Sequence, residues 1–276
     1  MFMHIFKCAG STLRHMLVDW AEENGEEGAI VRDCGQVEGG DICLKGYELI
    51  DEAVQMEQIS RLKVIAGHFM WGFQRHVQTP YLMVTALRNP LEVFVSGEQY
   101  MHRQETSTLP KAQQLLTEHM LRTMATNGPL GLQQGQVSGF IRRFAGVPRR
   151  VWFKDGLEQG ADDAIRNLET FWIVGVVEQY QGFEKVLQQS IDPEGKHGRL
   201  WKQYAEAQYN SSPIGTREVL AEIDPELVER FNGTLALQWK VYERAISLWG
   251  VRCREVLPTT MHEEMCTVPP PAQSYR

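Results

Sequence analysis

The residues with the clearest chemical potential lie near the start of the chain, in the stretch KCAGST at positions 7–12. This stretch joins an apolar run, residues 1–6, to a segment with apolar side chains at helical spacing, which predicts a strand, a tight loop and a helix. The first amides of a helix carry partial positive charge and lack partners within the helix. The loop is therefore a candidate phosphate or sulfate site, although simple helix capping by Ser11 or Thr12 fits the loop equally well.

The loop differs from the ATP-binding Walker A motif. That motif places its lysine directly after the second of two glycines, and a serine or threonine follows the lysine. In this chain Lys7 precedes Gly10, and no glycine stands five residues before the lysine. A nucleotide kinase would also need a magnesium-binding acid near such a loop, and the sequence offers no convincing one. A kinase is thus the weaker interpretation.

Three further polar residues stand at the ends of predicted strands. They are His68, the last residue but one of the run 62–69, Arg88, which follows 81–87, and Glu178, which follows 171–177. Because the carboxyl ends of parallel strands border one crevice, we expect these residues to gather with Lys7. Taken singly, each has a simpler interpretation: a structural histidine, an exposed turn residue and a surface carboxylate.

Together these residues suggest chemistry on a phosphorylated or sulfated ligand. Arg88 can hold a phosphate through two hydrogen bonds, and Ser96, eight residues later in the predicted helix 91–103, can donate its hydroxyl to the same group. Histidine has an ordinary pKa near neutrality, so His68 is a candidate general base.

Positioning these residues requires alternating strands and helices. Strands are predicted at 1–6, 62–69, 81–87, 151–154 and 171–177. Helices are predicted from residue 13 and at 47–61, 91–103, 111–126, 161–169, 180–190 and 225–249. The alternation predicts an α/β fold with a mainly parallel sheet covered on both faces, and ligands at the carboxyl ends of its strands.

Four segments in order resemble the carbohydrate sulfotransferases related to the heparan sulfate 2-O- and 6-O-sulfotransferases. They are HIFKCAGSTL at 4–13, AGHF at 66–69, LRNPLEVFVS at 87–96 and FWIVGVVEQYQGFEKVL at 171–187. Members of that family carry a HIPKTGGT-like loop, a strand ending in Gly-His and an LRDPVERF-x-S-like segment. The resemblance covers about residues 4–187, with weaker agreement at 209–213 and in the final helix.

The resemblance implies a P-loop-like sulfotransferase fold and 3′-phosphoadenosine 5′-phosphosulfate (PAPS) as sulfuryl donor, without a metal. It implies that the loop residues Lys7, Cys8, Ala9, Gly10, Ser11 and Thr12 hold the 5′-phosphosulfate and that Arg88 and Ser96 hold the 3′-phosphate. Lys7 would neutralise charge on the bridging oxygen, and His68 would take the proton of the acceptor hydroxyl. The expected acceptor is a glycan or another hydroxyl compound.

Three positions depart from the family pattern. Phe6 stands in place of a proline, Cys8 in place of a threonine and Val93 in place of an arginine. Cys8 removes a hydroxyl from the loop, although its backbone amide remains. These departures leave open a relative that binds a glycan or nucleotide without catalysis.

The composition sets limits on partners and organisation. With 276 residues, 43% of them hydrophobic, the chain can form one α/β domain, with a C-terminal helical segment at about 213–250 and a tail at about 251–276. The net charge of −7 argues against a general nucleic-acid partner. No apolar run approaches the roughly 18 residues of a membrane span, so no transmembrane segment is expected in this chain.

The compartment is not determined by the sequence. The Golgi lumen is expected if an N-terminal anchor precedes this chain, and the cytoplasm otherwise. The five cysteines form no zinc pattern; Cys34 and Cys43 can form a disulfide in an oxidising compartment, and free thiols fit equally well.

Overall fold

The computed structural model describes residues 1–33, 42–45, 48–49, 52–101, 139–147, 156–206 and 215–268. The helix predicted at 111–126, the strand predicted at 151–154 and Cys34 lie outside the described residues. The pairing of Cys34 with Cys43 therefore stays a prediction.

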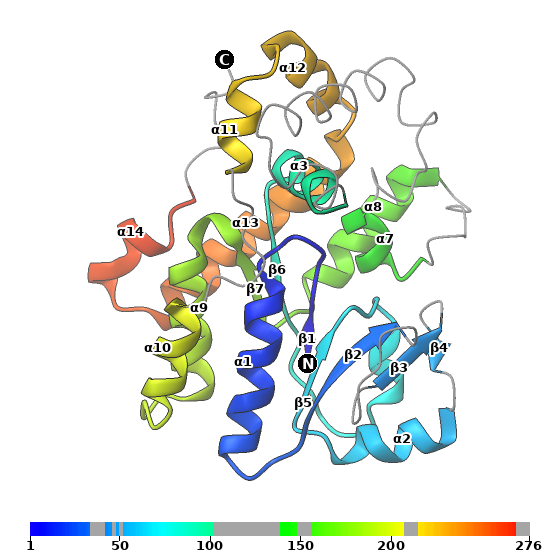
Figure 1. The fold of residues 1–276 in the computed structure, drawn as a ribbon, viewed down its shortest axis with the longest axis vertical. Coiled ribbons are helices and arrows are strands. Elements are labelled where there is room, and N and C mark those ends of the chain that lie inside the picture. The colour runs from blue at the N-terminus through cyan, green and yellow to red at the C-terminus, as the bar shows by residue number, and fades with distance from the viewer. Residues whose placement is uncertain are drawn as a thin grey trace.

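A mainly parallel sheet forms the centre of the fold (Figure 1). Its seven strands are β1 (Phe2–Met3), β2 (Gly28–Asp33), β3 (Ile42–Lys45), β4 (Glu48–Leu49), β5 (Val64–Gly67), β6 (Val84–Leu87) and β7 (Ile173–Val176). They lie in the order β4-β3-β2-β5-β1-β6-β7, and each neighbouring pair is parallel except the antiparallel pair β3–β4. The predicted α/β class with a mainly parallel sheet is confirmed.

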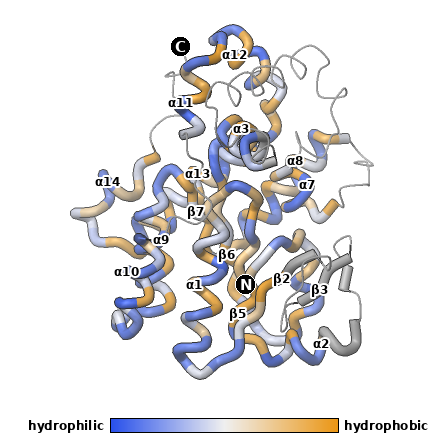
Figure 2. Tube along the Cα trace, in the orientation of Figure 1, coloured by the Kyte–Doolittle hydropathy of each residue, from blue (hydrophilic) through white to orange (hydrophobic). Residues whose placement is uncertain are grey.

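The central strands are short apolar runs. Every residue of β1, β5, β6 and β7 is buried, as is typical of parallel strands covered on both faces. Figure 2 shows hydrophobic residues concentrated in the sheet, while the surrounding helices mix both kinds. The predicted strands 1–6, 62–69, 81–87 and 171–177 are all present, but each is shorter than predicted.

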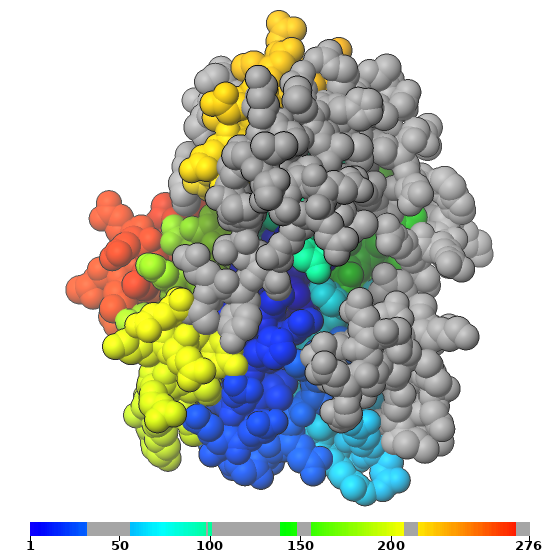
Figure 3. Space-filling view, viewed as in Figure 1, coloured from blue at the N-terminus to red at the C-terminus, as the bar shows by residue number. Residues whose placement is uncertain are grey.

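The helices surround this sheet. They are α1 (Gly10–Glu23), α2 (Glu52–Arg61), α3 (Pro90–Met101), α7 (Gly139–Ala145), α8 (Gly156–Leu168), α9 (Tyr180–Ile191), α10 (Gly198–Glu206), α11 (Thr216–Ala221), α12 (Pro225–Gly233), α13 (Ala236–Val256) and α14 (His262–Met265). Helix α1 packs against β2, β5 and α10, and α13 packs against β7, α8 and α9. Figure 3 shows α1 at the surface beside α10.

Two predicted helices were wrong, and some strands were missed. The predicted helix 47–61 begins only at Glu52, because residues 48–49 form β4. Strands β2, β3 and β4 were not predicted. The predicted helix 225–249 is two helices, α12 and α13, with Thr234 and Leu235 between them. The break has a packing cause: Leu227 and Phe231 join a small core with α3 and α11, whereas α13 packs into the main core.

One disulfide lies in the described part of the chain, between Cys253 of α13 and Cys266. This pair was not predicted from the sequence. Cys8 is buried and has no disulfide partner. Among the described helices, none is long and apolar enough to cross a membrane.

Candidate active site

Three neighbouring strands carry the residues singled out in the sequence. Lys7 lies in the loop after β1, His68 directly follows β5 and Arg88 directly follows β6. Strand β1 lies between β5 and β6, and all three run parallel. Their carboxyl ends therefore share one edge of the sheet. The chain continues from β1 toward β2 on one side and from β6 toward β7 on the other, and such a switch point opens a crevice for ligands.

The loop after β1 has an unusual backbone. Lys7 and Ala9 have φ angles of 62° and 54°, in the left-handed region that residues with a side chain seldom adopt. The amide of Cys8 donates to the carbonyl oxygen of Ile5 at 3.2 Å, which closes the turn. Strained residues of this kind concentrate at functional sites, where the surrounding structure holds them in place.

Helix α1 starts at this loop without a side-chain cap. Its N-cap residue is Ala9, which has no polar side chain, and its first turn contains no acidic residue. Ser11 and Thr12 lie inside the first turn, so the capping interpretation of these two residues is wrong. A helix start of this kind leaves partial positive charge available for an anion.

Gly10 is required at the first helical position. A Cβ atom there would lie 1.9 Å from Cδ2 of His4, whose ring fills this space. His4 is 4% exposed, so its ring has little room to move.

The ammonium of Lys7 lies beside two aromatic rings. Its Nζ is 4.5 Å from the ring centre of Tyr100 and 5.8 Å from that of Phe6. The two rings meet edge to face at 5.6 Å. Tyr100 belongs to the last turn of α3, so this helix contacts the loop after β1.

Cys8 joins the loop to the end of β6. Burial raises the pKa of its thiol, against the opposing effects of the charge of Arg88 and a hydrogen bond with the Arg88 backbone. The thiol is therefore neutral at physiological pH. Through Cys8, the loop after β1 therefore contacts the backbone of Arg88 directly after β6.

His68 stacks on His4, with ring centres 4.1 Å apart. Its Nδ1 lies 3.0 Å from the carbonyl oxygen of His4. A carbonyl oxygen only accepts, so Nδ1 carries the proton and Nε2 is the ring atom able to accept one. Burial, followed by the charge of Arg143, lowers the pKa of His68 to about 3. His68 is thus neutral at pH 7, and it is a weaker base than its ordinary pKa suggests.

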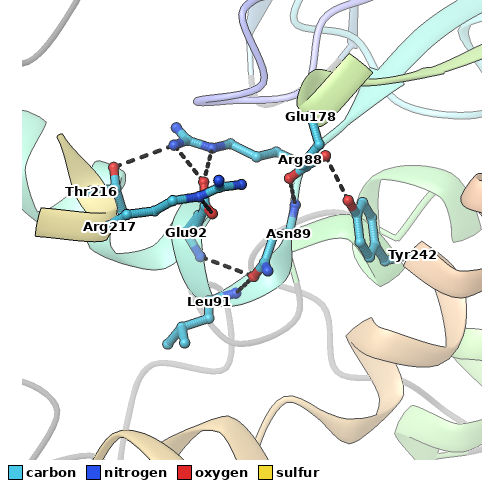
Figure 4. A network of polar contacts seen from close by, with 8 residues as sticks. All are labelled: Arg88, Asn89, Leu91, Glu92, Glu178, Thr216, Arg217 and Tyr242. Carbon is cyan, nitrogen blue, oxygen red and sulfur yellow. Dashed lines mark hydrogen bonds and ion pairs between the residues drawn. The ribbon is translucent and has the colours of Figure 1, made fainter. Parts of the chain in front are cut away.

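The guanidinium of Arg88 is engaged by a buried carboxylate (Figure 4). Its Nε and Nη2 donate to Oε2 of Glu92 at 3.0 and 2.8 Å, and Nη2 also donates to Oγ1 of Thr216 at 3.4 Å. Nε of Arg217 donates to the other oxygen of Glu92 at 2.8 Å. Two guanidiniums thus share one carboxylate.

Burial tends to raise the pKa of the Glu92 carboxyl. The hydrogen bond from Arg217 and the charge of Arg88 outweigh this effect, and the pKa is lowered below its ordinary value of 4.5. Glu92 is therefore ionised at neutral pH. The cluster of Arg88, Arg217 and Glu92 carries one net positive charge.

Glu178 supports the segment that follows Arg88. Its two carboxylate oxygens accept from the backbone amide of Asn89 at 2.7 Å and from the hydroxyl of Tyr242 at 2.6 Å. The interpretation of Glu178 as a surface carboxylate is wrong, and its hydrogen bonds do not go to His68. Burial, with the charge of Glu178, raises the pKa of Tyr242, so this hydroxyl remains a donor.

Ser96 is buried in α3, about two turns from Arg88. The side-chain hydrogen bonds of Arg88 go to Glu92 and Thr216 and not to Ser96. Sequence reasoning missed Glu92, although it stands four residues after Arg88, a spacing at which opposite charges often pair. It also missed Arg217, which is 125 residues from Glu92 and has no local signal.

A groove of about 440 Å³ lies at the opposite edge of the sheet. Its lining includes Met1, Val64 and Val84, at the amino ends of the central strands. The groove is therefore separate from the candidate active site. Among the described residues, no three His, Cys, Asp or Glu side chains gather in a way that could hold a metal ion.

The chain matches no protein-family model, and no curated protein shows significant similarity to it.

Proposed function

We propose that this protein is a P-loop-like sulfotransferase that transfers the sulfuryl group of PAPS to a hydroxyl of a carbohydrate. The observation that carries the proposal is the gathering of three sequence motifs at the ends of three adjacent strands. The loop 7–12, His68 and Arg88 are far apart in sequence, yet they follow β1, β5 and β6. The proposed roles need these three segments at the same edge of the sheet, because all of them would act on one donor molecule.

The loop after β1 suits the phosphosulfate end of the donor. Its residues Lys7 to Thr12 combine an ammonium group with a helix start that has no side-chain cap. Cys8 in place of threonine removes one hydroxyl, while Ser11 and Thr12 remain beside the helix start. The residues present therefore fit a sulfated nucleotide.

The Arg88 cluster suits the 3′-phosphate. Arg88 and Arg217 carry two positive charges, and Glu92 cancels one of them. A phosphate binds to such a cluster by taking over guanidinium hydrogen bonds that Glu92 holds. Ser96 remains a candidate donor to the same phosphate, with Arg217 as an additional one.

The proposed catalytic roles are those that the resemblance implies, assigned to the atoms that this site offers. PAPS supplies the sulfuryl group, which passes to the acceptor oxygen as the bond between sulfur and the bridging oxygen breaks. Lys7 neutralises the charge that develops on that bridging oxygen. His68 accepts the acceptor's proton at Nε2, since Nδ1 is held by the carbonyl of His4.

One observation favours a second candidate, a non-catalytic binding protein of the same fold. The pKa of His68, lowered to about 3, reduces its strength as a base. Such a relative would bind the nucleotide or a glycan without transfer.

Calorimetric titration with 3′-phosphoadenosine 5′-phosphate, the desulfated donor, tests the site. We expect micromolar binding that is lost in Lys7→Ala and Arg88→Ala. The matched controls are Lys202→Ala, at an exposed lysine of α10, and Arg61→Ala, which removes an exposed arginine paired with Glu57 at the same four-residue spacing. Failure of the folded wild type to bind would refute the proposed function.

A transfer assay with radiolabelled PAPS and a panel of glycans separates the two candidates. An enzyme should sulfate at least one glycan, and His68→Gln should reduce transfer by about 10²–10⁴-fold while nucleotide binding persists. Binding without transfer to any glycan, peptide or small alcohol would favour the non-catalytic relative.

A further inference from the structure

The surroundings of Lys7 contain a feature that the proposed roles do not use. Among the described residues, five large hydrophobic side chains are exposed, and two of them, Phe6 at 38% and Tyr100 at 45%, contact each other. Isolated exposed hydrophobic residues are common on protein surfaces. A pair of aromatic rings beside a lysine ammonium is more specific.

The contact joins two segments of the candidate active site. Phe6 precedes Lys7 in the loop after β1, and Tyr100 lies in the last turn of α3. Gly97, three residues before Tyr100, also faces Phe6: a Cβ at Gly97 would lie 3.6 Å from the Phe6 ring. Residues three apart share a face of a helix, so the loop packs along one face of α3.

Both the backbone and the side chain of Lys7 are therefore constrained. Its φ angle of 62° fixes the direction in which the side chain leaves the loop. Its Nζ then lies 4.5 Å from the Tyr100 ring centre, within the distance at which a cation is attracted by the electrons of an aromatic face. Phe6 lies edge-on to Tyr100 and completes the contact.

We propose that Tyr100 and Phe6 are positioning residues that hold the ammonium of Lys7 at the mouth of the anion loop. A lysine side chain has many rotamers, and ordering it costs conformational entropy at the moment a ligand binds. An ammonium already restricted by two rings lowers that cost. The catalytic consequence of this contact, but not the contact itself, rests on the proposed sulfotransferase function.

Nuclear magnetic resonance of the dimethylated protein tests the contact directly. Reductive methylation with ¹³C-formaldehyde labels lysine ammonium groups and keeps their charge, and Lys7→Arg identifies the Lys7 signal. We expect that signal upfield of the exposed lysines, because methyl groups above an aromatic ring are shielded. Tyr100→Phe should retain the shift, and Tyr100→Leu should reduce it strongly, because only the more distant Phe6 ring then remains. Tyr81→Leu, at an exposed tyrosine in the groove at the opposite edge, is the matched control and should leave it unchanged.

A Lys7 signal at the position of exposed lysines in the wild type would overturn the proposal. So would equal shifts in Tyr100→Leu and in the wild type. Circular dichroism of each labelled variant establishes that the comparison is made on folded protein.

Kinetics test the catalytic consequence. Tyr100→Leu should reduce kcat about two- to fivefold with a smaller change in the KM for PAPS, and Tyr100→Phe should restore it. An unchanged kcat in Tyr100→Leu would overturn the catalytic part. If the Lys7 signal is shielded but does not respond to 3′-phosphoadenosine 5′-phosphate, the contact stands and the proposed function fails, so the two failures are distinguishable.

Discussion

Helices α1 and α3 both follow central strands at the candidate site, but their first turns are built differently. Helix α1 starts after Ala9, which offers no capping side chain. At α3, Oδ1 of Asn89 accepts hydrogen bonds from the backbone amides of Leu91 and Glu92 at 3.0 and 3.3 Å. Pro90 occupies the first helical position. The second helix start is therefore satisfied by the chain itself.

Because of this difference, the starts of α1 and α3 would bind an anion through different groups. At α1 the backbone amides and Lys7 are the groups suited to an anion. At α3 the first amides are already used, so an anion there must be bound by side chains such as Arg88. The two first turns also differ in their acidic residues. The first turn of α1 has none, whereas that of α3 contains Glu92, which is bound by two arginines.

Among the substitutions that test the difference between the two helix starts, Gly10→Ala should reduce the free energy of unfolding most. The new Cβ would lie 1.9 Å from the buried His4 ring, so α1 cannot start in its present position. We expect the free energy of unfolding to fall by about 3 kcal/mol. Gly198→Ala is the matched control, because Gly198 also begins a helix and has open space around its Cβ position. Urea denaturation of both variants measures the difference, and equal stabilities would contradict the packing argument.

Glu92→Gln should come next. Removing the carboxylate charge leaves Arg88, 20% exposed, without its ionic partner, and we expect a loss of about 2 kcal/mol. The control Glu57→Gln breaks an exposed ion pair with Arg61 at the same spacing and should cost less than about 0.5 kcal/mol. Similar losses in the two variants would argue against a special role for the buried cluster.

Glu92→Gln should also change how the stability of the protein depends on pH. The pKa of Glu92 is lowered below 4.5 in the folded protein, so its contribution to stability is present above that pH and is lost as the pH falls through the lowered value. Glu92→Gln should therefore lose less stability than the wild type on acidification below pH 4.5. Denaturation curves recorded between pH 7 and pH 3 measure this, and parallel acid profiles would refute it.

Asn89→Ala should have a moderate effect. The loss of its two amide contacts should cost about 1 kcal/mol. Asp224→Ala removes a similar cap from α12, which also starts with a proline, and should cost about the same. Thermal unfolding compares the two. Only Asn89→Ala should weaken nucleotide binding in calorimetry, because it alone shifts the segment that carries Arg88.

Ala9→Gly should have the smallest effect and the opposite sign. Glycine adopts the φ of 54° without strain, which gains about 1 kcal/mol, partly offset by the greater freedom of glycine in the unfolded chain. We expect a net gain of about 0.5 kcal/mol in the free energy of unfolding. Ala236→Gly, at the exposed first residue of α13, should instead lose stability. A loss at both positions would show that the Ala9 conformation is not strained.

The sequence predicted local structure well where a local pattern specifies it. The apolar runs that became β5, β6 and β7 were recognisable because a buried parallel strand is apolar along its whole length. The start of α3 was recognisable from Asn89 and Pro90. The break between α12 and α13 was not, because one apolar stripe serves two separate cores and the sequence does not show where the chain changes direction.

The candidate site divides in the same way. Lys7, His68 and Arg88 were found from the sequence because each follows an apolar strand. Their surroundings were not found, since the contacts come from distant segments. Glu92 is shared with Arg217, and Glu178 accepts a hydrogen bond from Tyr242.

The sequence by itself determined the alternation of strands and helices and the residues that end the central strands, because hydrophobic periodicity and turn chemistry act over a few neighbouring residues. Tertiary structure alone decided the order of the strands and the electrostatic state of the site. His68 illustrates the physical reason: burial and the charge of Arg143 lower its pKa to about 3, and neither burial nor that neighbour can be read from the residues beside it in the chain.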